Sequence, residues 1–115
     1  MGTSARGRDF PSDRDVCDDA CPVRKAAEIV GGKWTTLIVR DLLSGTKRFS
    51  ELQKSLSGVS PKMLSARLGF LESKGLVSKT IYPVMPPKTE YALTERGRGL
   101  QDVIAAMARF GERIP

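Results

Sequence analysis

The stretch that decides the fold is SGVSPKMLSARLGFLESKGLV, residues 57–77. Ser60 is a good helix N-cap, and Pro61 suits the first helical position, where its missing N–H does no harm. Gly75 can adopt the left-handed conformation that ends many helices. Between these signals, leucines recur at i, i+4 and i+7, which predicts one buried stripe made of Leu64, Leu68 and Leu71. We therefore expect a helix that begins at Pro61 and ends before Gly75.

The opposite face of this helix consists of small residues and one lysine. At about 100° per residue, the positions that point away from the leucines are Lys62, Ala66, Gly69 and Ser73. A solvated helix face usually carries longer charged or polar side chains. Small side chains let a helix backbone approach its partner closely, and the major groove of DNA, about 12 Å wide, admits a helix. The alternative is that this face packs against another part of the same chain.

Charge is distributed unevenly along the 115 residues. Residues 1–22 hold three Arg and five Asp, a net −2, whereas residues 23–115 hold 16 Lys and Arg against eight Asp and Glu, a net +8. A basic folded part is expected of a nucleic-acid binder, although charge alone would also suit a membrane surface. No apolar run approaches the roughly 20 residues of a membrane span, and the start has no apolar signal-peptide core. We therefore expect a cytoplasmic protein of one domain with no membrane partner.

The composition excludes several kinds of catalytic and metal site. The chain has no histidine and two cysteines. Ser-His and Cys-His nucleophile pairs, and a tetrahedral zinc site within one chain, are therefore impossible. No P-loop or dinucleotide-binding fingerprint appears. We expect no enzyme activity, no cofactor and no metal.

The order of the other predicted elements places the central helix in a helix-turn-helix. Residues 1–20 are expected to form a flexible tail, because they are rich in Gly, Ser, Arg and Asp without any helical or strand period. Residues 46–48 form an extended link that could be a short strand. Three further helices are predicted at about 22–30, 33–43 and 50–56. The last of these, a Gly-containing turn and the helix from Pro61 describe a helix-turn-helix, although plain bundles also contain such pairs.

A β-hairpin is predicted directly after this motif. Residues 76–82 and 89–93 are β-prone, and the proline-rich link from Pro83 to Lys88 cannot be regular structure. Lys79 lies on one arm and Lys88 at the end of the tip. We expect a basic wing that touches phosphates or the adjacent minor groove. The alternative is that the two strands only close the core and their lysines are solvated.

The last predicted helix carries more apolar surface than one small domain can bury. Thr94 is its expected N-cap, and a broad apolar stripe along 94–113 consists of Leu100, Val103, Ile104, Met107 and Phe110. We infer that this helix and the helix over 22–30 form a homodimer interface. The predicted fold is thus mainly α with a small β-hairpin, a winged helix-turn-helix domain over 21–113 that dimerises through its terminal helices.

Several motifs in combination resemble the HxlR-type transcriptional regulators, which are bacterial winged-helix relatives of the MarR regulators. They are CP at 21–22, GGKW at 31–34, RFSEL at 48–52, SPKMLS at 60–65 and EYALT at 90–94. The resemblance covers about residues 17–113. It implies a homodimeric regulator that binds double-stranded DNA, often at genes answering electrophile, quinone or oxidative stress. It also implies a thiol sensor, because several members carry a sensing cysteine before a proline near the N-terminus, the position of Cys21.

The two cysteines lie in different predicted surroundings. Cys21 is expected at the start of a helix with two basic residues close behind, and both features favour the thiolate. Cys17 has three neighbouring aspartates, which oppose its ionisation. We hypothesise that Cys21 is the reactive thiolate and Cys17 its resolving partner, with either cysteine of a second subunit as an equal alternative. Without sensing, Cys21 would be a small buried hydrophobe and Cys17 a bystander in the tail.

The sequence therefore predicts a transcriptional repressor that binds two DNA half-sites and answers a small oxidant or electrophile. Phosphate contacts are expected from Arg48, Lys62, Arg67, Lys79 and Lys88, although Arg67 falls near the buried side of its helix at 100° spacing. Candidates near base edges are Ser60, Met63, Ser65 and Ala66. Two other classes stay open: a winged-helix module that binds proteins without nucleic acid, and a small thiol-disulfide enzyme.

Overall fold

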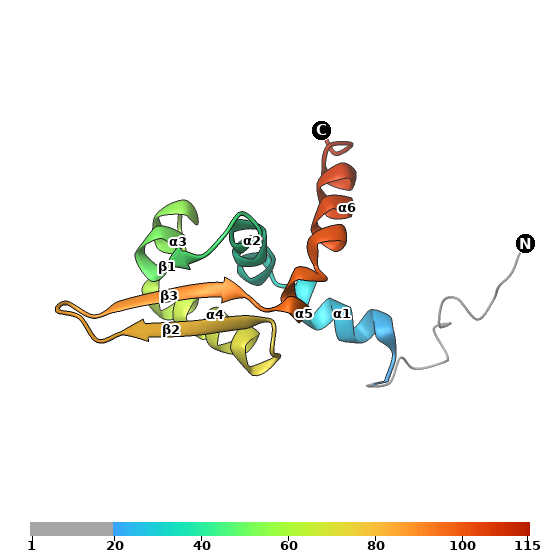
Figure 1. Ribbon diagram of the computed structural model, residues 1–115. Coiled ribbons are helices and arrows are strands. Elements are labelled where there is room, and N and C mark those ends of the chain that lie inside the picture. Colours follow the sequence, from blue (N-terminus) through green and yellow to red (C-terminus); the bar gives the residue numbers. More distant parts are fainter. Residues whose placement is uncertain (1–19) are drawn as a thin grey trace, which may run out of the picture.

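The computed structural model describes residues 20–115, so the predicted tail up to residue 19, with Cys17, lies outside the described residues. Figure 1 shows a mainly helical fold with a small antiparallel sheet, as predicted. In chain order its elements are α1 (Pro22–Val30), α2 (Lys33–Leu42), β1 (Lys47–Arg48), α3 (Phe49–Ser55), α4 (Pro61–Ser73), β2 (Val77–Tyr82), β3 (Lys88–Leu93), α5 (Glu95–Arg98) and α6 (Gln101–Gly111). None of the helices within residues 20–115 is both long and apolar enough to cross a bilayer.

One hydrophobic core joins α2, α3, α4 and the base of the sheet. The predicted leucine stripe of α4 lies at its centre, with Leu64, Leu68 and Leu71 at most 1% exposed. Fully burying a leucine side chain stabilises a fold by about 1.5–3 kcal/mol, so this stripe fixes the orientation of α4. The other members of the core that are at most 2% exposed are Ile38, Val39, Leu42, Leu52 and Leu56.

The predicted hairpin belongs to a three-stranded antiparallel sheet with the strand order β1-β3-β2. β2 and β3 pair along their full length, from Val77 opposite Leu93 to Tyr82 opposite Lys88. The two-residue strand β1 adds one short edge, with Lys47 opposite Tyr91. Tyr91 is buried, and burial, followed by the nearby charge of Glu72, raises the pKa of its phenol. The buried base anchors the sheet, while the far end of the hairpin projects beyond the helices (Figure 1).

The predicted final helix is wrong in one respect, because the chain forms two helices, α5 and α6, where one was expected. Thr94 is the N-cap of α5, as predicted: its hydroxyl accepts from the Gly97 N–H at 3.1 Å and donates to the Gly75 carbonyl at 2.6 Å. Gly97 packs so tightly that a Cβ there would collide with the Leu76 carbonyl oxygen. This contact holds α5 against the domain, and α6 then leaves at an angle with no buried residue (Figure 1). An apolar stripe alone does not reveal such an interruption.

Candidate nucleic-acid interface

The turn between α3 and α4 is held by backbone and side-chain hydrogen bonds. The Val59 N–H donates to the Leu56 carbonyl at 3.1 Å, and Gly58 has a φ of +95° that favours glycine. The Ser60 hydroxyl caps α4, as predicted, by accepting from the Met63 N–H at 3.0 Å. At the start of α3, the Arg48 N–H donates to Glu51 Oε1 at 2.7 Å. The first two contacts order the turn and the start of α4, and the third orders the start of α3.

The predicted small-residue face of α4 is open to solvent. Its residues Lys62, Ala66, Gly69 and Ser73 are all exposed. A Cβ added to Gly69 would meet no atom within 4 Å, so neighbouring elements of residues 20–115 do not cover this face. The alternative that it packs against another described part of the chain is therefore excluded. We call the exposed residues Lys62, Met63, Ser65, Ala66, Arg67, Gly69 and Ser73 the α4 outer face.

Arg67 lies near the buried side of α4 by helical spacing, yet it is exposed. A long arginine stem can run along apolar surface while the guanidinium stays in water. Arg67 can therefore reach a partner that lies on the α4 outer face.

The two lysines of the wing differ in their exposure to solvent and in the side chains that surround them. Lys79 on β2 is exposed. Lys88, which is paired with Tyr82 across the hairpin, lies 3.5 Å from Glu90 Oε2 and 4.8 Å from the centre of the Tyr82 ring. The Tyr82 hydroxyl also donates to Glu90 at 3.1 Å, and this hydrogen bond is the main reason that the pKa of Tyr82 is raised. Lys88 thus has a carboxylate beside its ammonium group, whereas Lys79 is exposed.

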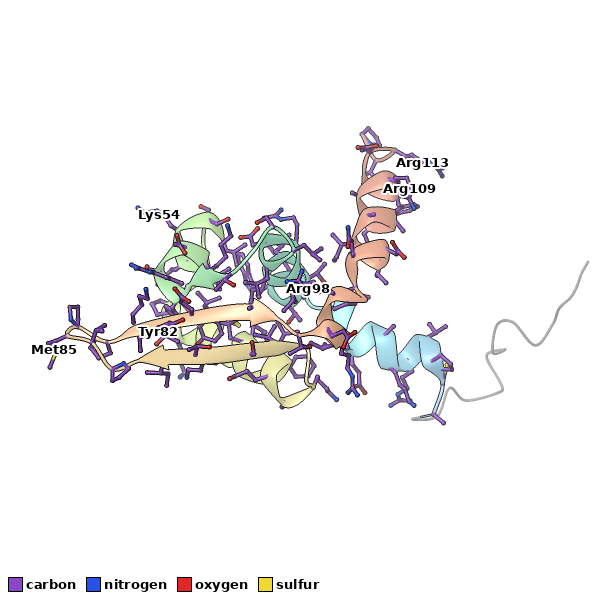
Figure 2. All side chains as sticks on the ribbon, in the orientation of Figure 1. Lys54, Tyr82, Met85, Arg98, Arg109 and Arg113 are labelled. Atoms are coloured by element: carbon purple, nitrogen blue, oxygen red, sulfur yellow. The ribbon has the colours of Figure 1, made fainter. Side chains whose placement is uncertain are left out.

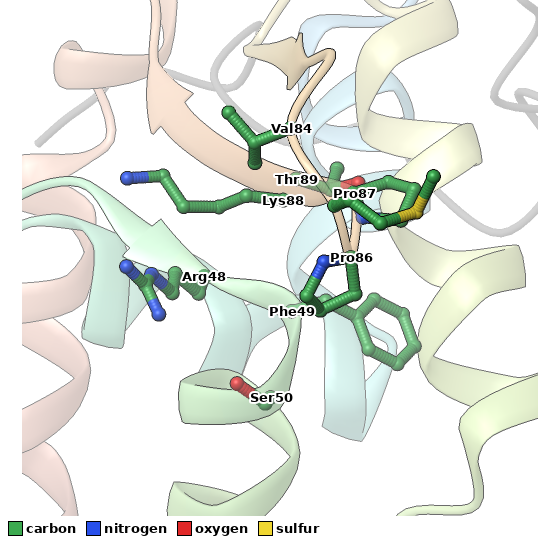
Figure 3. A pocket seen from close by; sticks show the side chains of 9 residues that line it. Arg48, Phe49, Ser50, Val84, Pro86, Pro87, Lys88 and Thr89 are labelled. Atoms are coloured by element: carbon green, nitrogen blue, oxygen red, sulfur yellow. The ribbon is translucent and has the colours of Figure 1, made fainter.

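A hollow of about 560 Å³ lies between the far end of the hairpin and the start of α3 (Figure 3). Arg48, Phe49 and Ser50 line one side, and residues 84–89 line the other. In Figure 3 the side chains of Arg48 and Lys88 extend toward the same side of this hollow. The structure therefore brings the predicted residues into two groups, one on the α4 outer face and one around the hollow. Lys79 belongs to neither group and lies on β2 of the wing.

Comparison with known proteins agrees with this geometry. The model of the HxlR-like helix-turn-helix family matches residues 29–114. The chain belongs to this family. YdeP of Bacillus subtilis, an uncharacterised HTH-type transcriptional regulator, is 40% identical over 107 residues, which are 93% of this chain and 81% of YdeP.

Solved structures show the same fold. A Porphyromonas gingivalis W83 protein assigned to the MarR family superposes with a TM-score of 0.81 at 41% identity, over 87% of this chain and 98% of that one. The redox regulator HypR in its oxidised form gives 0.77 at 36% identity, over 83% and 98%. The resemblance inferred from the sequence motifs is confirmed, and this HxlR-type chain is a DNA-binding transcriptional regulator with a winged helix-turn-helix.

In this HxlR-type regulator, Cys21 is the N-cap residue of α1, as predicted. It is half-buried and disulfide-bonded, whereas Cys17 lies outside the described residues. Among residues 20–115, no group of three or more His, Cys, Asp or Glu side chains could hold a metal ion.

The sequence analysis missed one property of the wing, which is its apolar tip. Residues 83–87 read PVMPP and carry no charge, and the Met85 side chain is 93% exposed. The uncharged residues 83–87 are visible in the sequence, but the prediction of a basic wing was based on Lys79 and Lys88 on either side of them.

Proposed function

We propose that this HxlR-type regulator is a homodimeric repressor that places α4 in the major groove at each of two DNA half-sites. The observation that carries this proposal is the two-sidedness of α4. One side is buried in the core through three leucines, and the other side is exposed and carries mainly small residues, with Lys62 and Met63 near its start. The buried side leaves α4 no freedom to turn, so the α4 outer face is what a partner meets.

The residues around α4 divide into phosphate and base contacts. Lys62, Arg67, Lys79 and Arg48 are exposed cations that fit phosphates, and such contacts make binding salt-dependent. Lys88 contributes less, because Glu90 already accompanies its ammonium. Candidates near base edges are Ser60, Met63, Ser65 and Ala66, of which Met63 and Ala66 suit a thymine methyl group.

The proposed dimer uses α6 together with α1. The exposed apolar residues of α6 and the chain end recur on one stripe, with Met107 40%, Phe110 64% and Ile114 60% exposed. They line an open hollow of about 720 Å³. On α1, Val23 is 60% exposed. Two copies joined through these helices would present two α4 helices, and dimeric helix-turn-helix proteins read half-sites about 34–36 Å apart.

The proposed signal is oxidation of Cys21 by a small oxidant or electrophile. Its position at the N-cap of α1 supports this role, since a helix N-terminus stabilises a thiolate. The relative HypR is a redox regulator with structures of its oxidised and reduced forms. In the reduced protein Cys21 would be a thiol, and oxidation would form the disulfide in which the structure holds it. Two thiols, Cys21 and either Cys17 or a cysteine of a second subunit, give two electrons and two protons to the oxidant. α1 contacts the end of α4 through Glu28 and Lys74, 3.4 Å apart, so a shift of α1 would reach the DNA-binding helix.

A gel shift with the DNA upstream of the regulator's own gene tests this proposal. Reduced protein should bind this DNA more tightly than random duplex, and diamide should weaken the binding. Cys21→Ser should bind normally and resist diamide, while Cys17→Ser distinguishes the resolving partner. Equal binding to operator and random duplex under reductant would overturn the proposed repressor function. An unchanged affinity in diamide would overturn only the proposed sensing by Cys21.

A further inference from the structure

The far end of the wing exposes apolar side chains where the protein has no core to bury them. Met85 is 93% exposed, Ile81 61% and Val84 54%. Figure 2 shows Met85 at the outermost point of the hairpin, where it borders the open hollow opposite the start of α3. Exposed apolar surface on a projecting element is unfavourable in water, so it indicates a partner that removes this surface from solvent. We call residues 83–87 the wing tip.

The size and surroundings of the wing tip favour DNA as this partner. Five residues cannot bury the roughly 800 Å² per partner of a stable protein interface. A narrow convex tip fits a groove, and the minor groove is about 6 Å wide. Two exposed cations lie on the same side of the tip, toward the body of the domain, namely Arg48 across the hollow and Lys79 on β2, four residues before Pro83. An apolar end beside cations matches a duplex, whose phosphates border grooves that lead to apolar base faces.

The hairpin is also stiff enough to act as a wedge. Pro83, Pro86 and Pro87 each have a fixed φ. Directly below the tip, the Tyr82 hydroxyl on β2 donates to Glu90 on β3 at 3.1 Å, and Glu90 in turn pairs with Lys88 of its own strand at 3.5 Å. A tip that is ordered before binding loses little conformational entropy when it enters a groove.

We propose that Met85 inserts from the minor groove between two stacked base pairs and kinks the DNA at that step. This inference rests on the proposed DNA-binding mode and adds a second mode of recognition to it. Apolar wedges unstack a base step at a cost that depends on the step, and pyrimidine–purine steps unstack most easily. The wing would therefore select deformable steps without any hydrogen bond to a base, while α4 reads base edges in the major groove.

The test uses the full chain and a duplex that it selects from random sequences under reductant. 2-Aminopurine replaces adenine at each step under the wing in turn, because this base fluoresces more strongly when it is unstacked. The wild-type chain should raise the fluorescence severalfold at one step in each half-site. Met85→Ala should abolish the rise and lower the affinity for the selected duplex on the order of tenfold. It should also remove the sequence preference at that step in a repeated selection.

Two further variants make the result specific. Met85→Leu keeps a large apolar side chain and should keep the fluorescence rise. Lys79→Ala should reduce the salt dependence but leave the rise in place, because it removes only a phosphate contact. Thermal melting controls for folding, and Met85→Ala should melt with the wild type because the side chain is 93% exposed.

Tight, selective binding with no fluorescence rise at any step would overturn the wedge and leave the proposed repressor intact. The wedge would also be overturned if Met85→Ala raises the fluorescence as the wild type does. It would likewise be overturned if this variant changes the oligomeric state in light scattering without changing the fluorescence. The last result would identify the tip as a contact between proteins. If no duplex is selected over random sequence, the proposed function itself fails.

Discussion

α4 and α6 each leave one side exposed, and the chemistry of those two sides differs. α4 has 13 residues, buries three leucines and exposes small and polar residues. α6 has 11 residues, buries none and exposes large apolar ones such as Met107 and Phe110. The exposed side of α4, where Met63 is the one large apolar residue, can meet a charged, hydrated groove closely, whereas a side of large apolar groups gains most from meeting another apolar surface. This contrast is the reason for proposing DNA as the partner of α4 and a protein surface as the partner of α6.

The largest expected effect tests the buried side of α4. Leu68→Ala should lower the free energy of unfolding by about 2–5 kcal/mol, because it leaves a cavity in the core. Denaturant unfolding followed by circular dichroism measures this change. Met63→Ala, on the exposed side of the same helix, is the matched control and should cost less than about 1 kcal/mol. Equal losses from the two variants would contradict the two-sidedness of α4.

The next effect tests α6. Phe110→Asp places a charge on the proposed interface, and we expect light scattering to show a monomer where the wild type is a dimer. Central aromatic residues of interfaces contribute about 2 kcal/mol or more, which is roughly thirtyfold in the dissociation constant. Arg109→Ala, next to the apolar stripe, should leave the dimer intact. If Phe110→Asp stays dimeric, the interface lies elsewhere.

A smaller effect separates stability from binding on the α4 outer face. Gly69→Ala and Gly69→Leu should each stabilise the protein by about 0.5–1 kcal/mol, since glycine is a poor helix former and its surroundings are open. In fluorescence anisotropy, the leucine variant should bind the selected duplex more weakly than the alanine variant, by about 1–3 kcal/mol. Unchanged DNA affinity with leucine at this position would show that the α4 outer face does not enter the groove.

The smallest effect compares two lysines. Lys62→Ala should weaken binding to all duplexes alike and reduce the slope of log affinity against log salt by about 1. Lys88→Ala should change this slope less, because Glu90 lies 3.5 Å from the Lys88 ammonium. Anisotropy titrations at several salt concentrations measure both slopes. A loss confined to one sequence after Lys62→Ala would mean that this lysine reads a base, and equal slopes for both variants would mean that Glu90 does not restrain Lys88.

Much of the fold was predictable because local signals agree with one another. Ser60 and Pro61 start α4, Gly75 with a φ of +73° follows its end, and the leucine period identifies the buried side. The family resemblance likewise followed from short motifs. The candidate site was less predictable, because the spacing that places Arg67 beside the leucines says nothing of where its flexible end lies.

The sequence by itself determined the helix-turn-helix, the hairpin and the small-residue composition of the α4 outer face, because capping, periodicity and turn residues act over a few positions. Only the tertiary structure decided that α5 and α6 are separate helices, with α5 packed through Gly97 against the Leu76 carbonyl, a contact between distant segments. The tertiary structure also decided that the Lys88 ammonium lies beside the Glu90 carboxylate and the Tyr82 ring, and that the outermost point of the wing is Met85. Strand register sets both, because it determines which side chains meet across the hairpin and which are left at its end.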